Sequence, residues 1–358
     1  MYRVNGLSRR MSIGVYPAIT LSEARTVHAK AREELGKGTD PGRELVEKKK
    51  GERKAPTVEG LVEEYLEKWA KPRKKTWKED KRILYKDVIP VIGRRKAKDV
   101  KKRDVVLLLD AVVNRGAPIT ANKTYEILRK MFNFAVSRSI LEYSPCGGIE
   151  KPSKSKTRDR VLEEKEIILI WEKLEELPIT KGAELAIKLL LVLGQRRGET
   201  VSIAWKEIDL DKQTWTIPGE KAKNGIPHKV PLPSLAMEII LEAKELAGNY
   251  QWVFPGVSGD KSLSPRSISQ IVIKHQASFG VDHFTVHDLR RTMASLMTGM
   301  GVPRLMVSKI LNHSEGGTTR IYDRHTYDAE KRQALETWER KLRAILFDEK
   351  SKVINLKR

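Results

Sequence analysis

Two charged stretches without apolar periodicity divide this 358-residue chain into three segments. KKKGERKAP runs from Lys48 to Pro56, and KPSKSKTRDR runs from Lys151 to Arg160. Such stretches have no hydrophobic face to bury and are typical of linkers. With 40% hydrophobic residues, the chain has enough apolar side chains for two or three domains with separate cores. The predicted division is an N-terminal domain at 1–47, a linker at 48–56, a helical domain at 57–150, a linker at 151–160, a third domain at 161–346 and a tail at 347–358.

The charge balance predicts a polyanionic partner. The chain carries 69 Lys and Arg against 47 Asp and Glu, a net charge of +22. Residues 58–157 are the most basic part, with 24 basic and 13 acidic side chains. Nucleic acid is the leading candidate, because a basic surface attracts its phosphates. A membrane partner is disfavoured, because the sequence has neither a lipidation signal nor an apolar run long enough to span a bilayer.

The same survey predicts the compartment and the absence of cofactors. The N-terminus, MYRVNGLSRR, lacks the pattern of a signal peptide, so we expect a cytoplasmic, nucleoid-associated protein. Cys146 is the only cysteine, which excludes an internal disulfide, and it is predicted to be a small buried apolar residue. The sequence contains no P-loop, no His-Glu-x-x-His and no acidic metal-binding cluster. We therefore expect neither metal nor cofactor.

Local patterns predict a hairpin followed by helices in the first two segments. YRVNGLSRRMSIGVY gives two short strands joined across Asn5-Gly6, and Thr20 with Glu23 forms a capping-box pattern before a helix that stops at Gly36. In the second segment, apolar periodicity predicts four helices. They lie near 58–69 with Thr57 as N-cap, near 77–89, near 105–113 with Asp104 as cap, and near 127–136 with Thr120 as cap.

Basic residues cluster three times within this helical segment. A solvated charged face is the usual explanation for one such cluster. Three clusters in one small domain favour a surface that follows DNA phosphates. The candidate DNA-binding residues are Lys71, Arg73, Lys74, Lys75, Arg94, Arg95, Lys96, Lys101, Lys102 and Arg103.

The third segment mixes helices with strand-like stretches. QTWTIPG at 213–219 and HKVPLP at 228–233 flank Asn224-Gly225, a turn signal. This pattern predicts a β-hairpin whose tip carries Lys221 and Lys223.

Four short motifs follow one another in the third segment. They are LGQRRGE at 193–199, KAKNG with HKVPL behind it, HDLRRT at 287–292, and LNH followed by TTRIYDRH at 311–325. On a helix, His287 and Arg290 are surface neighbours and can hold one anion. Tyr322 follows His313 by nine residues. In this order and spacing the motifs resemble those of the tyrosine recombinase, or phage integrase, family. The resemblance spans nearly the whole chain and extends to integrases of satellite phages, prophages and genomic islands.

The resemblance implies a mostly helical, multidomain α+β protein. Its parts would be a truncated, arm-binding-like N-terminal domain of hairpin plus helix, a helical core-binding (SAM-like) domain, and a catalytic domain with a small antiparallel sheet. The implied activity is site-specific DNA recombination that integrates or excises a prophage or genomic island, without metal or ATP. The implied partners are double-stranded DNA attachment sites, three further copies in a homotetramer on paired sites, and accessory DNA-bending proteins.

The resemblance also assigns roles to six residues. Arg196 and Arg290 would stabilise negative charge on the phosphate, a task that suits the fork of a guanidinium. Tyr322 would attack the phosphorus and form a 3′-phosphotyrosyl bond. His287 and His313 are candidates for accepting its proton or binding the phosphate.

Lys223 would donate a proton to the departing 5′ oxygen, and Lys221 is the alternative. Tyr327 is the alternative nucleophile. Glu199 is expected to orient its neighbours. Trp338 and Leu342, at helical spacing, are expected to be docking or core residues.

The sequence departs from the family pattern twice. Further strands usually precede YRVNG in this subgroup, which puts arm-site binding in question. Asn312 stands where Gly is commoner, and Asn can adopt the left-handed backbone conformation that Gly usually supplies. Two other functions stay open at this point: a type IB topoisomerase-like activity, and a non-catalytic DNA-binding remnant of an integrase.

Overall fold

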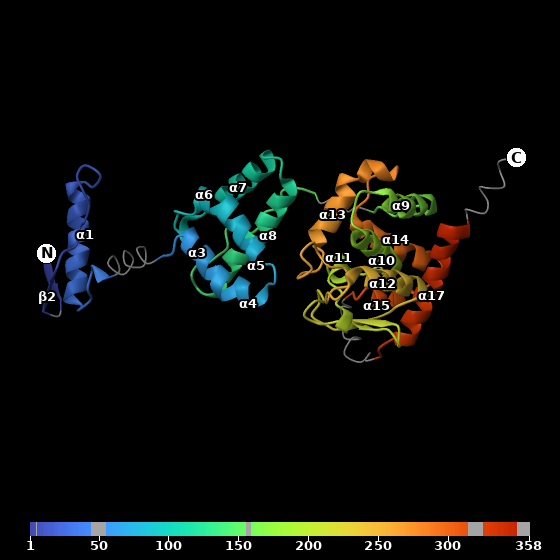
Figure 1. Cartoon of the computed structure of the whole chain (residues 1–358). Helices are drawn as coiled ribbons and strands as arrows, with labels where there is room; N and C mark the ends of the chain where they lie inside the picture. The colour runs from blue at the N-terminus through green and yellow to red at the C-terminus, as the bar shows by residue number, and fades with distance from the viewer. Residues whose placement is uncertain (5, 44–54, 155–158, 314–324, 349–358) are drawn as a thin grey trace. The chain divides into compact units, whose positions relative to one another are not determined.

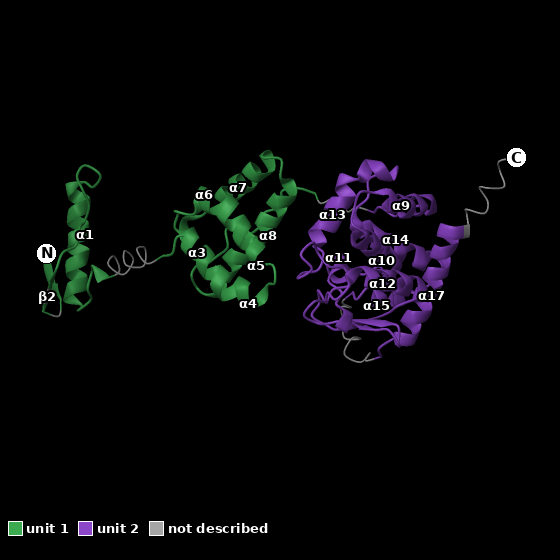
Figure 2. Cartoon of the chain, in the orientation of Figure 1, with its two compact units in different colours: residues 1–157 green, residues 158–358 purple. Residues whose placement is uncertain are grey.

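The structure is a computed structural model that describes residues 1–4, 6–43, 55–154, 159–313 and 325–348. The chain forms two compact units, residues 1–157 and 158–358 (Figure 2). Most of the predicted linker at 48–56 and the centre of that at 151–160 lie outside the described residues. Among the helices that the structure describes, none is long and apolar enough to cross a bilayer.

The N-terminal part of the first unit is a hairpin beside one helix (Figure 1). Strands β1 (Tyr2–Val4) and β2 (Leu7–Arg9) pair antiparallel with Val4 opposite Leu7, as the hairpin pattern predicted. Helix α1 (Leu21–Gly36) begins at the predicted capping box, in which Thr20 and Glu23 bond each other's backbone N–H. Asp40 accepts a hydrogen bond of 2.6 Å from the Tyr2 hydroxyl and pairs with Arg9.

The rest of the first unit is the predicted cluster of four helical runs around an apolar core. Each of the first two runs contains one wider π-helical turn. The runs are α3 (Val58–Tyr65) with η1 (Leu66–Ala70) and α4 (Lys71–Arg73); α5 (Trp77–Ile83) with η2 (Leu84–Val88) and α6 (Ile89–Ile92); then, after the short turn η3 (Ala97–Asp99), α7 (Lys102–Asn114); and α8 (Pro118–Ser137). Cys146 is buried in the same core, and burial raises its pKa to about 12, so the thiol stays neutral as expected.

Two of the predicted helix caps in this unit are wrong. Thr57 caps α3 as expected and accepts the N–H of Gly60 at 3.2 Å. Asp104, however, lies inside α7 and reaches back to the backbone N–H of Lys101 at 3.0 Å. Thr120 also lies inside its helix, because α8 starts at Pro118. A proline ring fixes φ at a helical value and needs no N–H partner, so α8 begins three residues earlier than a cap at Thr120 would place it.

The second unit packs helices around α10 (Lys181–Leu193), with a small sheet beside them (Figure 1). The other elements are α9 (Glu164–Glu176), α11 (Arg197–Val201), η4 (Trp205–Glu207), β3 (Ile208–Asp209), β4 (Thr214–Ile217), β5 (His228–Pro231), α12 (Ser234–Ala247), α13 (Pro265–Lys274), η5 (Gln276–Phe279), α14 (Val286–Gly299), α15 (Arg304–Ile310), α17 (Asp328–Arg343) and η6 (Ala344–Asp348).

Helix α10 is central because most of its residues are apolar and its charged side chains, Lys181, Glu184 and Lys188, share one face. Residues 183–193 are all buried, and α10 contacts α9, α12, α14 and α17. Its one buried cation, Lys188, pairs with Glu184 at 2.8 Å and Glu175 at 2.6 Å. Trp338 of α17 is fully buried, and its indole N–H donates to the Leu191 carbonyl at 3.3 Å. Trp338 and Leu342 are therefore core residues.

The sheet has the strand order β3-β4-β5, and both pairings are antiparallel. The two predicted strands pair with Ile217 opposite His228, so a connection of ten residues, 218–227, joins them. This is the predicted hairpin with Lys221 and Lys223 in its tip, and Ala222 between them is fully buried and holds the loop against the unit. The chain as a whole is a mostly helical multidomain protein with a small antiparallel sheet, as predicted.

Candidate active site

A cavity of about 860 Å³ opens in the second unit and gathers residues from four of the motifs. It is lined by Gln195, Arg196, Arg197, Gly198, Lys223, Asn224, Val286, His287, Arg290, Asn312 and His313. Five of the six residues predicted to carry the chemistry are among them. They come from the start of α11, the β4–β5 connection, the first two turns of α14 and the turn that follows α15.

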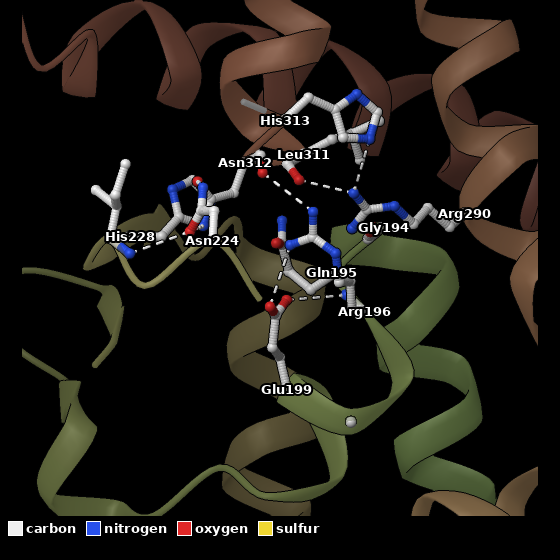
Figure 3. A network of polar contacts seen from close by, with 12 residues as sticks. Gly194, Gln195, Arg196, Glu199, Asn224, His228, Arg290, Leu311, Asn312 and His313 are labelled. Carbon is white, nitrogen blue, oxygen red and sulfur yellow. Dashed lines mark hydrogen bonds and ion pairs between the residues drawn. The ribbon is translucent and has the colours of Figure 1, made fainter. Parts of the chain in front are cut away.

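Arg290 lies at the back of the cavity and is only 5% exposed. Its guanidinium donates to the Gly194 carbonyl at 2.8 Å, to the Leu311 carbonyl at 2.7 Å and to His313 Nε2 at 3.1 Å (Figure 3). A guanidinium cannot accept, so His313 Nε2 is the acceptor and its ring is neutral in this arrangement. His287, one helical turn earlier in α14, is exposed on the same face.

Arg196 stands at the start of α11, where the chain leaves α10. Gly194 ends α10 with φ +61°, and a Cβ at this position would collide with Met293. This turn points Arg196 at the cavity. Its guanidinium donates to Glu199 at 3.1 Å and to the Asn312 carbonyl at 3.1 Å, while Glu199 also accepts the Arg196 backbone N–H at 3.3 Å. Glu199 therefore orients the arginine, as predicted.

The carbonyl end of α15 holds both arginines. The last carbonyls of a helix have no partner within it and need donors from elsewhere. Here the Leu311 carbonyl accepts Arg290 and the Asn312 carbonyl accepts Arg196 (Figure 3). Asn312 has φ +50°, which is the left-handed conformation expected of it. That conformation turns the chain so that His313 faces the cavity.

Burial and mutual repulsion lower the pKa values of ionisable groups that line the cavity. Burial, and next Arg196, lower the pKa of Arg290 to about 10. Burial, followed by the charge of Arg290, lowers the pKa of His287 and also that of His313. Both imidazoles are therefore neutral at pH 7, which is the state that can accept a proton. A bound anion would offset the repulsion between the two guanidiniums.

The two candidate lysines occupy different environments. Lys221 bonds the Ser202 carbonyl at 2.5 Å, pairs with the buried Glu207 and lies 5.1 Å from the Trp252 ring centre. Lys223 is exposed and lines the cavity. Of the two, only Lys223 lines the cavity.

Tyr322 lies outside the described residues. The alternative nucleophile, Tyr327, is half-buried at the start of α17 with φ +55°. Its ring packs edge-on against His325 at 4.5 Å, and Lys309 lies 4.7 Å from the ring centre. Tyr327 is not among the residues that line the cavity.

Three polar residues of this network had no predicted role. Gln195 donates to the Ile310 carbonyl at 2.9 Å, and His228 Nε2 donates to the same carbonyl at 2.9 Å. Asn224 bonds Asn312 across the cavity rim. For His228 a signal existed: it alternates with the buried Val230 along β5, so strand periodicity places it on the inner face. Within the described residues, no group of three or more His, Cys, Asp or Glu is arranged to hold a metal.

Several of the predicted DNA-binding residues already form hydrogen bonds or ion pairs within the first unit. Lys74 is tied to the buried Asp80 at 2.6 Å, Lys96 donates to the Ala55 carbonyl at 2.7 Å, and Lys102 donates to the Gly148 carbonyl at 2.8 Å. Lys71 pairs with Glu67, Arg73 bonds the Lys68 carbonyl at 3.2 Å, and Arg95 pairs with Asp104 at 2.7 Å. Lys75, Arg94, Lys101 and Arg103 have exposed side chains.

Three family descriptions match successive parts of the chain. The arm DNA-binding domain matches residues 1–48, the phage integrase central domain matches 58–151, and the phage integrase family matches 160–329. This chain belongs to the phage integrase family. Its second unit is thus a tyrosine recombinase catalytic domain, as the four motifs predicted.

Relatives of this family member extend over most of its length. Prophage integrase IntZ of Escherichia coli K12 is 28% identical, over 96% of this chain and 86% of its own. The integrase of enterobacteria phage P4 is 24% identical, over 92% of this chain and 79% of its own.

Solved structures of lambda integrase share the fold. The structure of a tetramer bound to a Holliday junction has a TM-score of 0.63 at 18% identity, covering 86% of this chain and 88% of that one. A dimer of a lambda integrase fragment bound to a core site has a TM-score of 0.62 at 19% identity, covering 72% of this chain and 96% of that one.

Proposed function

We propose that this phage integrase is a site-specific DNA recombinase that integrates or excises a prophage or genomic island. It cuts and rejoins DNA through a 3′-phosphotyrosyl intermediate. The observation that carries the proposal is the convergence of two guanidiniums, two neutral imidazoles and one lysine on a single cavity. This set matches phosphoryl transfer, in which negative charge gathers on the non-bridging oxygens and must be stabilised.

Each side chain takes one part of the reaction. The Tyr322 oxygen attacks the phosphorus, the bond from phosphorus to the 5′ oxygen breaks, and the DNA 3′ phosphate becomes joined to the tyrosine. His287 or His313 accepts the phenolic proton, and Lys223 gives a proton to the departing 5′ oxygen. Arg196 and Arg290 bind the non-bridging oxygens. Attack of a 5′ hydroxyl from a second duplex then reverses these steps and completes the exchange.

The assembly follows from the same proposal. We infer that the integrase acts as a homotetramer on paired double-stranded attachment sites, with accessory DNA-bending proteins. Support comes from lambda integrase, which has been solved as a dimer on a core site and as a tetramer on a Holliday junction. The domain boundaries 1–47, 57–150 and 161–346 remain part of this proposal.

The decisive test compares two tyrosines. The substrate is a duplex spanning an end of the DNA element that carries the gene, with a nick that traps the cleaved strand. We expect the wild-type protein to form an SDS-resistant covalent adduct, and Tyr322→Phe to lose it while retaining DNA binding. Tyr327→Phe is the matched control, because phenylalanine preserves its ring contacts with His325 and Lys309.

Other outcomes separate the alternatives. An adduct that persists in Tyr322→Phe and disappears in Tyr327→Phe would reverse the assignment of the nucleophile. Relaxation of supercoiled DNA without strand transfer between two duplexes would indicate a type IB topoisomerase. DNA binding without any adduct from the wild-type protein would indicate a non-catalytic remnant.

A further inference from the structure

Two asparagine side chains join loops that are distant in the sequence. Asn224 Nδ2 donates to Asn312 Oδ1 at 2.7 Å, and Asn312 Nδ2 lies 3.5 Å from Asn224 Oδ1 (Figure 3). Asn224 belongs to the β4–β5 connection, and Asn312 follows α15. The amide pair therefore links the loop of Lys223 to the turn that carries His313.

The side chain of Asn312 does more than its backbone requires. Its φ of +50° and its carbonyl, which accepts Arg196, concern the main chain alone. Glycine would adopt this φ at no steric cost. The amide that asparagine adds is the group that reaches Asn224.

The loop of Lys223 needs an anchor on this side. Before Lys223, the chain is held by the Lys221–Glu207 pair and by the buried Ala222. After it, residues 225–227 are exposed. Asn224 bonds Asn312 and accepts the Ile226 N–H at 3.1 Å, so it connects this half of the loop to the turn that carries His313.

We propose that Asn224 and Asn312 are positioning residues, whose amide pair holds Lys223 where it can protonate the departing 5′ oxygen. The inference rests on the proposed function, in which Lys223 is the general acid. An exposed lysine has four rotatable bonds, so fixing the adjacent backbone is the available means of directing its ammonium group. A proton donor acts only within hydrogen-bond reach of the atom it protonates.

The test uses two variants, each of which removes one side-chain amide and is compatible with the observed backbone conformation. Asn312→Gly removes the amide and retains the left-handed conformation, and Asn224→Ala removes the other partner. Single-turnover cleavage is measured on ordinary DNA and on DNA with sulfur in place of the bridging 5′ oxygen at the scissile phosphate. A thiolate leaves without a proton, so the sulfur substrate does not need the general acid.

We expect both variants to cleave ordinary DNA about tenfold more slowly, since a net hydrogen bond or two is lost. On the sulfur substrate they should cleave at nearly the wild-type rate. The double variant should be no slower than the singles, because one interaction is removed in all three. Lys223→Ala serves as the reference. It should cleave ordinary DNA more slowly than either asparagine variant, and on the sulfur substrate its cleavage rate should also return to nearly the wild-type rate.

Three results would overturn the inference. Wild-type rates on ordinary DNA would show that the amide pair does not matter for cleavage. Equal slowing on both substrates, with Lys223→Ala restored by sulfur, would reduce the pair to a structural contact. If the sulfur substrate does not restore the cleavage rate of Lys223→Ala itself, Lys223 is not the general acid. Asn224 and Asn312 then do not act by positioning it.

Discussion

The Arg290 guanidinium is a buried charge that three acceptors make tolerable. Removing a cation from water is costly unless hydrogen bonds replace the solvent. The carbonyls of Gly194 and Leu311 and the Nε2 atom of His313 supply them. Each acceptor is neutral, so the positive charge remains available to an incoming phosphate. Burial, and next the charge of Arg196, lower the pKa of Arg290.

At the same scale, the two lysines of the β4–β5 connection should respond differently to mutation. Lys221→Ala leaves Glu207, which is 8% exposed, without its cation. We expect it to lower the free energy of unfolding by about 2–3 kcal/mol, less than for a fully buried pair because Lys221 is partly exposed. Lys223→Ala is the matched control and should change it by less than about 0.5 kcal/mol. Urea unfolding measures both. Equal stabilities would contradict a structural role for Lys221.

At the scale of the element, the carbonyl end of α15 brings the site together. Ile310 accepts Gln195 and His228, Leu311 accepts Arg290, and Asn312 accepts Arg196. One short helix end thus links the start of α11, strand β5 and α14. A rotation of this helix would move both arginines at once, because both bind its carbonyls.

His228, which ties β5 to α15, should make the second unit sensitive to acid. Burial, and next Lys331, lower its pKa from 6.5 to about 4. Below pH 6.5, His228 is protonated in the unfolded chain but stays neutral in the folded chain. The free energy of unfolding therefore falls as the pH is lowered to about 4. We expect His228→Gln, which keeps a donor, to be less sensitive to pH. Between pH 7 and pH 4 the wild type should lose about 3 kcal/mol more than the variant. Parallel stability curves would refute this.

At the scale of the whole molecule, positive charge is concentrated in residues 58–157. Part of that charge is already paired within the unit, as for Lys74 with Asp80. Arg94, Lys101 and Arg103 expose their side chains and are the better candidates for phosphate contacts.

Neutralising these three residues tests where the integrase meets DNA. Replacing Arg94, Lys101 and Arg103 by Gln should reduce the slope of log affinity against log salt by up to about 2.7, or about 0.9 for each phosphate contact. The control replaces Lys165, Lys244 and Arg340, exposed cations of the second unit outside the cavity, and should leave the slope nearly unchanged. Similar slopes for both triple variants would mean that net charge alone governs binding.

The sequence by itself determined what depends on neighbours along the chain. Apolar periodicity gave the four helical runs of residues 58–137, and the pair Thr20 and Glu23 gave the start of α1. The left-handed φ of Asn312 was expected because Gly is commoner at this place in the family motif. Motif order identified the residues of the cavity, because those motifs belong to a recognisable family. The cap assignments of Asp104 and Thr120 failed, because the two helices begin after Lys101 and Ala117, residue types that the local capping rule does not favour.

Only the tertiary structure decided which distant groups meet. Asn224 and Asn312 are 88 residues apart, and Arg196 lies 116 residues before the carbonyl that holds it. No local pattern encodes such contacts, since they arise from how α10, α14 and α15 pack. The same packing separates Lys221, bound to Glu207, from Lys223 at the cavity. Side-chain type limits which chemistry is possible, and packing selects the atoms that perform it.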